Sequence, residues 1–122
     1  MSAESLPPNR RRSRLLRQEE IDLVQALVGT VPKSQFVTED LTIYEVVDLS
    51  DGRMGSIRFL TSNEKGRGYS GTIAETEYVD EDGVTVSIAL SVDNTGELYE
   101  LDFWKVDFSP LSRYPRSEDL TR

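Results

Sequence analysis

The chain has 122 residues, of which 37% are hydrophobic and 30% charged, and its formal net charge is −8. These values suit one soluble globular domain, and no apolar run approaches the ~20 residues that a membrane-spanning helix needs. The chain contains no cysteine and no histidine, which excludes disulfides, thiolate nucleophiles, Ser–His triads and metal sites built on either residue. Any catalysis would have to use carboxylates, lysine, tyrosine or arginine. The N-terminus lacks the apolar segment of a secretory signal, so we expect a cytoplasmic protein.

The charge is unevenly distributed along the chain. Residues 1–17 hold five arginines and one acid, whereas residues 18–122 hold nine basic and 21 acidic side chains. Paired prolines and an arginine run with little apolar surface predict a flexible basic arm at 1–13. We expect a single domain at 14–115 and a flexible tail at 116–122. An acidic body repels phosphate backbones and attracts basic proteins, so nucleic acid is a poor candidate partner, with the arginine run as the one reservation.

One amphipathic helix is predicted at residues 16–28. The apolar side chains recur there at helical spacing, with Gly29 as a C-terminal cap before Pro32. Glu20 falls inside the apolar arc, either at its edge and reaching water or partly buried. The apolar side chains of this arc are Leu16, Ile21, Leu23, Val24, Leu27 and Val28.

Segments with period-2 alternation predict a sheet. A first strand is expected at 41–47 and a second at 56–60, followed by a flexible loop at 61–70. Three meander strands follow at 72–79, 84–92 and 97–106, separated by two acidic turns that end in glycine. We therefore predict an α+β fold in which one N-terminal helix packs on a mainly antiparallel sheet of about five strands. A small open β-barrel is the alternative.

Strand alternation assigns the side chains to two faces of this sheet. In the middle meander strand Val84, Val86, Ile88 and Leu90 face the core, and in the next strand Tyr99, Leu101 and Phe103 should do the same. The opposite face has small residues at its centre, Ser87, Ala89 and Ser91, with carboxylates on each side. We call this surface the acidic trough; its expected binding residues are Glu75, Glu77, Glu100, Asp102 and Trp104.

Three interpretations of the acidic trough remain open. It could be a solvated sheet face, as antiparallel sheets commonly have. It could dock a basic protein, because a partner's Lys or Arg would relieve the repulsion between neighbouring carboxylates. It could also supply a carboxylate pair for glycoside hydrolysis or for binding Mg²⁺ or Ca²⁺. No catalytic residue, resident metal or cofactor is nominated, and we expect a protein that is not an enzyme.

Three runs of sequence carry a resemblance: DGRMGSIRF at 51–59, IAETEYVDEDGVTVSIAL at 73–90 and GELYELDFWKVDFSPL at 96–111. Together they resemble a family of small uncharacterised bacterial proteins of unknown function over about residues 15–115, with ELDFWKVDFSPL as the most specific part. The family supplies no catalytic residue. The chain is similar in style to acidic immunity proteins, which bind and neutralise a cognate toxin. This similarity implies a non-enzymatic binding module, an immunity-type inhibitor of a basic toxin or nuclease; a carboxylate-based hydrolase or divalent-cation-binding protein is the alternative.

Overall fold

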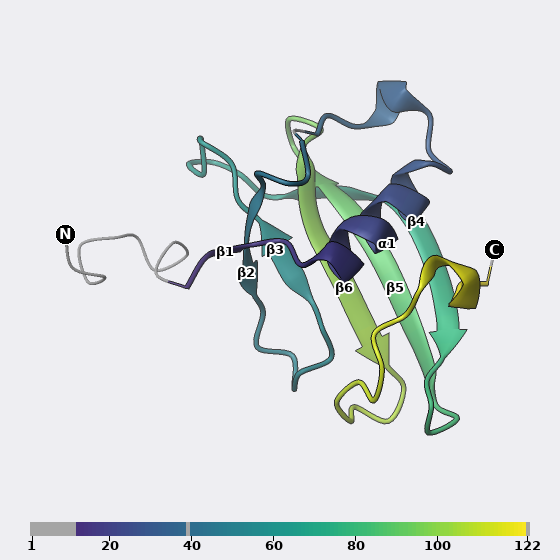
Figure 1. Ribbon diagram of the computed structural model, residues 1–122. Helices are drawn as coiled ribbons and strands as arrows, with labels where there is room; N and C mark the ends of the chain where they lie inside the picture. Colours follow the sequence, from purple (N-terminus) through teal and green to yellow (C-terminus); the bar gives the residue numbers. More distant parts are fainter. Residues whose placement is uncertain (1–11, 39, 122) are drawn as a thin grey trace.

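The computed structural model describes residues 12–38 and 40–121 as one helix packed across one face of a six-stranded sheet (Figure 1). All neighbouring strands in the order β1-β2-β3-β6-β5-β4 are antiparallel. The α+β prediction is confirmed. Of the predicted basic arm at 1–13, only Arg12 and Ser13 are among the described residues. The elements are β1 (Arg14–Leu15), α1 (Gln18–Val28), η3 (Lys33–Gln35), β2 (Glu45–Asp48), β3 (Ile57–Phe59), β4 (Tyr69–Val79), β5 (Thr85–Asp93), β6 (Leu98–Lys105) and η4 (Ser117–Asp119).

The strand count and the closure of the sheet differ from two expectations. The sixth strand is β1, in which Arg14 pairs with Val46 and Leu15 with Glu45. A two-residue strand carries too few side chains to show a period-2 pattern. Within the described residues β1 and β4 form the two edges of an open sheet, so the barrel alternative is wrong.

The first predicted strand, 41–47, begins later than expected, at Glu45. The Asp40 side chain accepts hydrogen bonds from the backbone N–H of Thr42 at 2.9 Å and from its hydroxyl at 2.7 Å. This local bonding gives the backbone an alternative to strand pairing. Residues 41–43 therefore form a turn.

The core lies between α1 and the sheet. Leu23, Val24 and Leu27 of the helix belong to the same buried cluster as Ile88 and Leu101 of the central strands. Each fully buried side chain of this size contributes about 1.5–3 kcal/mol relative to its exposed state. The predicted inward orientation of the middle meander strand is thus correct over Val86, Ile88 and Leu90.

The prediction that Tyr99 points into the core is wrong. Leu90 pairs with Leu101, and Val92 pairs with Leu98, so β6 contains one more residue than β5 between these two pairs. This β-bulge turns Leu98 into the core, where it is fully buried, and leaves Tyr99 only partly buried. The guanidinium groups of Arg58 and Arg67 lie 5.0 and 5.1 Å from the centre of the Tyr99 ring.

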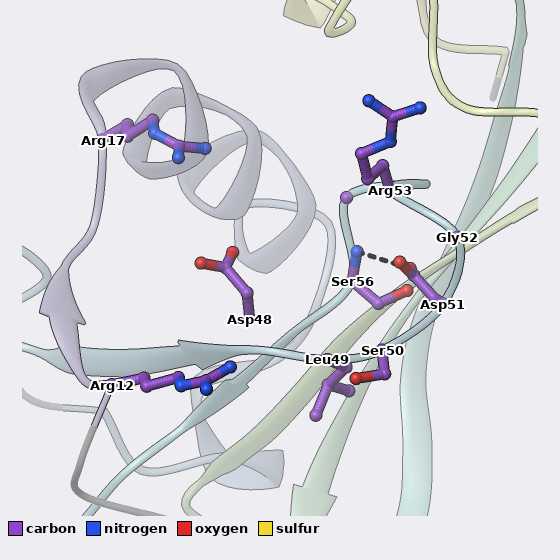
Figure 2. A pocket seen from close by; sticks show the side chains of 10 residues that line it. Arg12, Arg17, Asp48, Leu49, Ser50, Asp51, Gly52, Arg53 and Ser56 are labelled. Atoms are coloured by element: carbon purple, nitrogen blue, oxygen red, sulfur yellow. Dashed lines mark hydrogen bonds between the residues drawn. The ribbon is translucent and has the colours of Figure 1, made fainter.

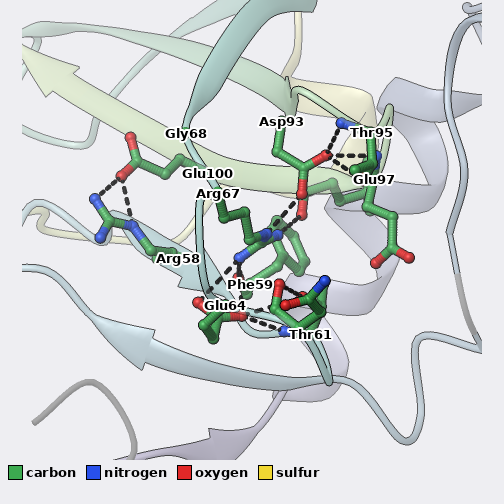
Figure 3. A network of polar contacts seen from close by, with 12 residues as sticks. Arg58, Phe59, Thr61, Glu64, Arg67, Gly68, Asp93, Thr95, Glu97 and Glu100 are labelled. Carbon is green, nitrogen blue, oxygen red and sulfur yellow. Dashed lines mark hydrogen bonds and ion pairs between the residues drawn. The ribbon is translucent and has the colours of Figure 1, made fainter. Parts of the chain in front are cut away.

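Two buried cations hold the ends of the meander. Lys105 is fully buried, and its Nζ donates to Asp80 at 2.9 Å, to Asp82 at 2.6 Å and to the carbonyl of Pro110 at 3.0 Å. This cluster ties the β4–β5 turn to the segment after β6. At the other end Arg67 donates to Asp93 at 2.6 Å and to the Leu98 carbonyl at 2.6 Å. Figure 3 shows the bond between Arg67 and Asp93.

The segment after β6 folds back on the molecule. Tyr114 lies 5.4 Å from Phe103 between ring centres, and the Tyr78 hydroxyl donates to the Arg113 carbonyl at 2.9 Å. The predicted flexible tail at 116–122 contains η4, and Thr121 forms an antiparallel bridge with Glu77. These contacts locate the tail beside β4; its flexibility stays a prediction.

Candidate functional site

The register of the meander places the predicted acidic residues across three strands on the face opposite α1. Glu75 lies opposite Ala89, which lies opposite Asp102, and in the next row Glu77, Ser87 and Trp104 are paired in the same way. The small central residues leave a hollow of about 630 Å³. The acidic trough is therefore a concave surface, lined by Glu75, Thr76, Glu77, Ser87, Ile88, Ala89, Asp102, Trp104 and Thr121.

Glu100, the fifth expected binding residue, does not line this hollow. Its carboxylate accepts a hydrogen bond from Arg58 Nε at 2.9 Å, and the two residues pair directly between β3 and β6 (Figure 3). Glu100 thus has a cation within the chain. Sequence reasoning missed this ion pair, because alternation does not reveal that β3 lies next to β6.

Asp102 is the most perturbed carboxyl of the acidic trough. Partial burial, followed by the nearby charge of Glu100, raises the pKa of Asp102 to about 6. Glu75, Glu77 and Asp102 form no ion pair with any residue that the structure describes. A cation placed against this surface would stabilise the ionised form of Asp102.

An apolar surface adjoins the acidic trough at the end nearest the β4–β5 turn. Val79 pairs with Thr85, whose carbonyl accepts the N–H of Val106, so these residues continue the same outward rows. The ring of Trp104 lies 6.2 Å from that of Phe108. We call the four exposed side chains the apolar rim: Val79, Trp104, Val106 and Phe108, which are 61%, 57%, 56% and 67% exposed.

Backbone geometry fixes the position of Phe108 in the apolar rim. Its φ of 62° lies in the left-handed region, which a bulky residue adopts only when the surroundings enforce it. The Phe108 N–H donates to the Lys105 carbonyl at 2.8 Å, and the side chain of Asp107 accepts from the N–H of Ser109 at 3.0 Å. Of the four rim residues, Trp104 was predicted from the sequence as a binding residue. The sequence carried no such indication for the other three rim residues.

The C-terminal segment forms one wall of the acidic trough. The N–H of Thr121 donates to the Glu77 carbonyl at 2.8 Å, and the Thr76 hydroxyl donates to the Thr121 carbonyl at 2.5 Å. This contact covers part of the exposed edge of β4. No sequence pattern indicated it, because the segment contains too few residues to show alternation.

The chemistry available in the acidic trough is restricted to carboxylates, hydroxyls and one indole. Among residues 12–38 and 40–121, no group of three or more acidic side chains is arranged to hold a metal ion. The surface can supply a negative field, hydrogen-bond acceptors and apolar contact area.

Comparison with known proteins gives a family without an assigned activity. A family model described as "Domain of unknown function (DUF6984)" matches residues 13–115. The chain belongs to this family. The resemblance expected over about residues 15–115 is confirmed. No curated protein and no solved structure matches the chain. In the part of the chain that the structure describes, no helix is long and apolar enough to cross a membrane.

Proposed function

We propose that this protein is a non-enzymatic binding module whose acidic trough and apolar rim hold a basic segment of another protein. The observation that carries the proposal is the combination of three carboxylates, Glu75, Glu77 and Asp102, that have no cation partner among the described residues, with an exposed aromatic pair beside them. Glu75 and Glu77 project from the same face of β4, and Asp102 lies two strands away on β6, so like charges gather on one face of the sheet and repel one another. A lysine or arginine of a partner would relieve that repulsion.

The two halves of the surface have different tasks in this proposal. The carboxylates attract a basic partner over a distance and orient it, which raises the association rate. Trp104 and Phe108 supply apolar area that leaves water on contact, and a tryptophan at the centre of an interface commonly contributes a large share of the affinity. The expected partner therefore carries both lysine or arginine and apolar side chains.

A specific form of the proposal is an immunity-type inhibitor that acts in the cytoplasm on a basic toxin or nuclease. What supports it is the charge complementarity with such a partner and the similarity in style to immunity proteins. Occlusion of the partner's own site by the sheet face would be the mechanism.

The first experiment uses a fluorescent peptide of four Lys-Val repeats as the probe, with four Glu-Val repeats as the control. We expect the basic peptide alone to bind, with an affinity that falls roughly tenfold between about 50 and about 200 mM salt as the charges are screened. The measurement is fluorescence anisotropy over a salt series. Binding that does not depend on salt would contradict the steering mechanism.

Matched charge reversals distinguish binding at the acidic trough from binding that follows the net negative charge of the protein. The Glu77→Lys and Asp102→Lys pair should abolish peptide binding. The control pair is Glu81→Lys and Glu118→Lys, at side chains that are 61% and 68% exposed outside the acidic trough. Both pairs change the net charge equally. Similar losses from both pairs would show that binding follows net charge alone.

Proton release gives a second test that depends on the location of the site. Since the pKa of Asp102 is raised to about 6, a bound lysine should lower it and expel a proton. Peptide affinity should therefore be higher at pH 7.5 than at pH 5, and Asp102→Asn should remove most of that difference. An unchanged pH dependence in the variant would place the peptide elsewhere.

The alternative function is a carboxylate-based hydrolase or a divalent-cation-binding protein. The raised pKa of Asp102 favours it, because a carboxyl that holds its proton near neutral pH can act as a general acid. Nitrophenyl glycosides and calorimetry with Ca²⁺ or Mg²⁺ test it. A rate that falls about 100-fold or more in Asp102→Asn, or a saturable isotherm that the variant abolishes, would favour this function over the binding module.

A further inference from the structure

A second hollow, of about 600 Å³, lies between the chain preceding α1 and the connection from β2 to β3. Figure 2 shows Arg12 and Arg17 on one side of it and Arg53 on the other, with Asp48 between them. We call this surface the arginine hollow. It is lined by Arg12, Arg17, Asp48, Leu49, Ser50, Asp51, Gly52, Arg53, Gly55 and Ser56.

The arginines of this hollow differ from the other described arginines in their partners. Five arginines elsewhere in the described chain each place a side-chain nitrogen 2.6–3.1 Å from a carboxylate: Arg14, Arg58, Arg67, Arg113 and Arg116. Arg17 comes no closer than 3.9 Å to Glu20, and Arg12 and Arg53 form no ion pair with a described residue. Three guanidinium groups that have no carboxylate within hydrogen-bonding distance among the described residues thus gather around one concavity of an acidic protein.

The carboxylates at the arginine hollow are already engaged. Both oxygens of Asp48 accept from Arg14, at 2.8 and 3.1 Å, and this bonding lowers the pKa of Asp48 below its usual value. Asp51 accepts the backbone N–H groups of Met54 at 3.0 Å and Ser56 at 2.9 Å, the second of which is drawn in Figure 2. Both carboxylates that line the hollow are therefore bonded to groups other than its three arginines.

Arg14, behind the arginine hollow, adds a fourth positive charge to this region. It also donates to both oxygens of Glu20, a helix residue that is only 1% exposed, at 2.8 Å each. Four arginines at and behind the arginine hollow face three carboxylates, all of which accept hydrogen bonds from the chain itself. The result is a locally positive surface on a chain whose net charge is −8.

The loop that carries Arg53 is held in an unusual conformation. Arg53 has a φ of 63°, in the left-handed region, between two glycines that also have positive φ, Gly52 at 75° and Gly55 at 104°. A long side chain in this region is uncommon, and strain of this kind is found at ligand sites. The two hydrogen bonds to Asp51 enforce the conformation and fix where the Arg53 side chain leaves the backbone.

From this geometry we infer that the arginine hollow binds a compact phosphate-type oxyanion, such as the diphosphate group of a small molecule. Guanidinium groups present parallel N–H donors that match phosphate oxygens, and charge-assisted bonds of this type are strong. A volume near 600 Å³ is within the range of small-molecule pockets. An extended nucleic-acid strand fits less well, because the acidic body would repel its remaining phosphates.

The test is calorimetric titration with pyrophosphate and with inorganic phosphate, at an ionic strength held constant with sodium chloride. We expect pyrophosphate to bind more tightly than phosphate. Arg17→Gln and Arg53→Gln should each weaken pyrophosphate binding by about tenfold or more, since each removes a bidentate donor. The matched control, Arg116→Gln, changes the net charge equally at a side chain that is 70% exposed outside the arginine hollow, and should leave the affinity unchanged.

A further variant distinguishes the loss of a binding residue from a loss of folded protein. Arg53→Gly removes the guanidinium while relieving the left-handed backbone, so it should weaken pyrophosphate binding without lowering the Tm. Equal losses in Arg53→Gln and Arg116→Gln, or no heat of binding at about 5 mM pyrophosphate, would overturn the inference. Tighter binding of a single-stranded oligonucleotide than of pyrophosphate would overturn it in favour of nucleic acid. None of these outcomes depends on the acidic trough, so they do not bear on the proposed protein-binding function.

Discussion

The acidic trough and the arginine hollow are similar in size and opposite in charge, and they are built in different ways. The acidic trough rests on three strands paired in register, with carboxylates at alternate positions. The arginine hollow joins the segment before α1 to a loop, and its charge depends on which carboxylates are already bonded. A surface on regular strands is specified by local sequence pattern. A surface assembled from loops is specified by tertiary contacts.

The two surfaces also share one feature. Among the described residues, only Phe108 and Arg53 combine a positive φ with a side chain; Phe108 lies in the apolar rim beside the acidic trough, and Arg53 lines the arginine hollow. Both positions place a long side chain at the edge of a hollow. At both surfaces an irregular segment, the turn after β6 and the loop between β2 and β3, thus orients one contact residue through a left-handed backbone.

The largest expected effect concerns the strand beneath the acidic trough. Ile88→Ala should lower the free energy of unfolding by about 2–5 kcal/mol, because it opens a cavity in the core, whereas the adjacent Ser87→Ala should be nearly neutral. Urea unfolding of both variants gives the measurement. Equal losses would be incompatible with the assignment of the two residues to opposite faces.

Replacing a single polar side chain in the loop beneath the arginine hollow should lower stability more than replacing Ser87 on the outer face of β5. Asp51→Ala leaves the N–H groups of Met54 and Ser56 without their acceptor, and should lower stability by about 1–3 kcal/mol. It should also weaken pyrophosphate binding while leaving the basic peptide bound as before. Ser34→Ala, at an exposed position outside the arginine hollow, is the control. A loss of peptide binding in Asp51→Ala would mean that the two surfaces are not independent.

Asp102 of the acidic trough should make the stability of the protein depend on pH. Because the folded pKa of Asp102, about 6, exceeds its ordinary value of 3.8, folding favours the protonated form, and this contribution is lost as the pH rises from about 4 through 6. Asp102→Asn should therefore gain stability relative to the parent across that window and level off above it. Solvent screening limits the gain to about 1 kcal/mol. Tm values at pH 4.5, 6 and 7.5 provide the measurement; a constant difference would refute the assignment.

The smallest expected effects separate the two surfaces most cleanly. Phe108→Gly and Arg53→Gly should each change stability by no more than about 1 kcal/mol, since relief of the left-handed backbone offsets the added freedom of glycine. Phe108→Gly should weaken only the basic peptide, and Arg53→Gly only pyrophosphate. Loss of both ligands in either variant would contradict separate sites.

The parts predicted correctly from the sequence are those with long, regular patterns. The helix and the three meander strands each contain enough apolar residues to define a period, and the same alternation placed Glu75, Glu77 and Asp102 on one face. The errors occur where one local hydrogen bond or one extra residue determines where a strand begins or which face a side chain lies on. Asp40 bonds Thr42 and delays the first strand, and a bulge turns Tyr99 outward.

The ion pairs of Arg58 and Arg67 could be predicted only by knowing which strands are neighbours in the folded sheet. Arg58 neutralises Glu100 only because β3 lies beside β6 in the sheet, although β4 and β5 separate these two strands in the sequence. Arg67 lies in the loop predicted at 61–70, which ends where β4 begins, and Asp93 and two carbonyls surround its guanidinium. A sequence pattern cannot show either partner, since both depend on contacts between distant residues.

The short junction between β3 and β6 divides the sheet into two halves. Only two residue pairs join these strands, Ile57 with Leu101 and Arg58 with Glu100, whereas β5 is paired along its length on both sides. Such a junction is where a sheet can open below the level of global unfolding. In native-state hydrogen exchange, amides of β2 and β3 should then lose protection before those of β5. The arginine hollow would thus belong to a less stable cooperative unit than the acidic trough, and a ligand bound there would slow exchange in its own half of the sheet.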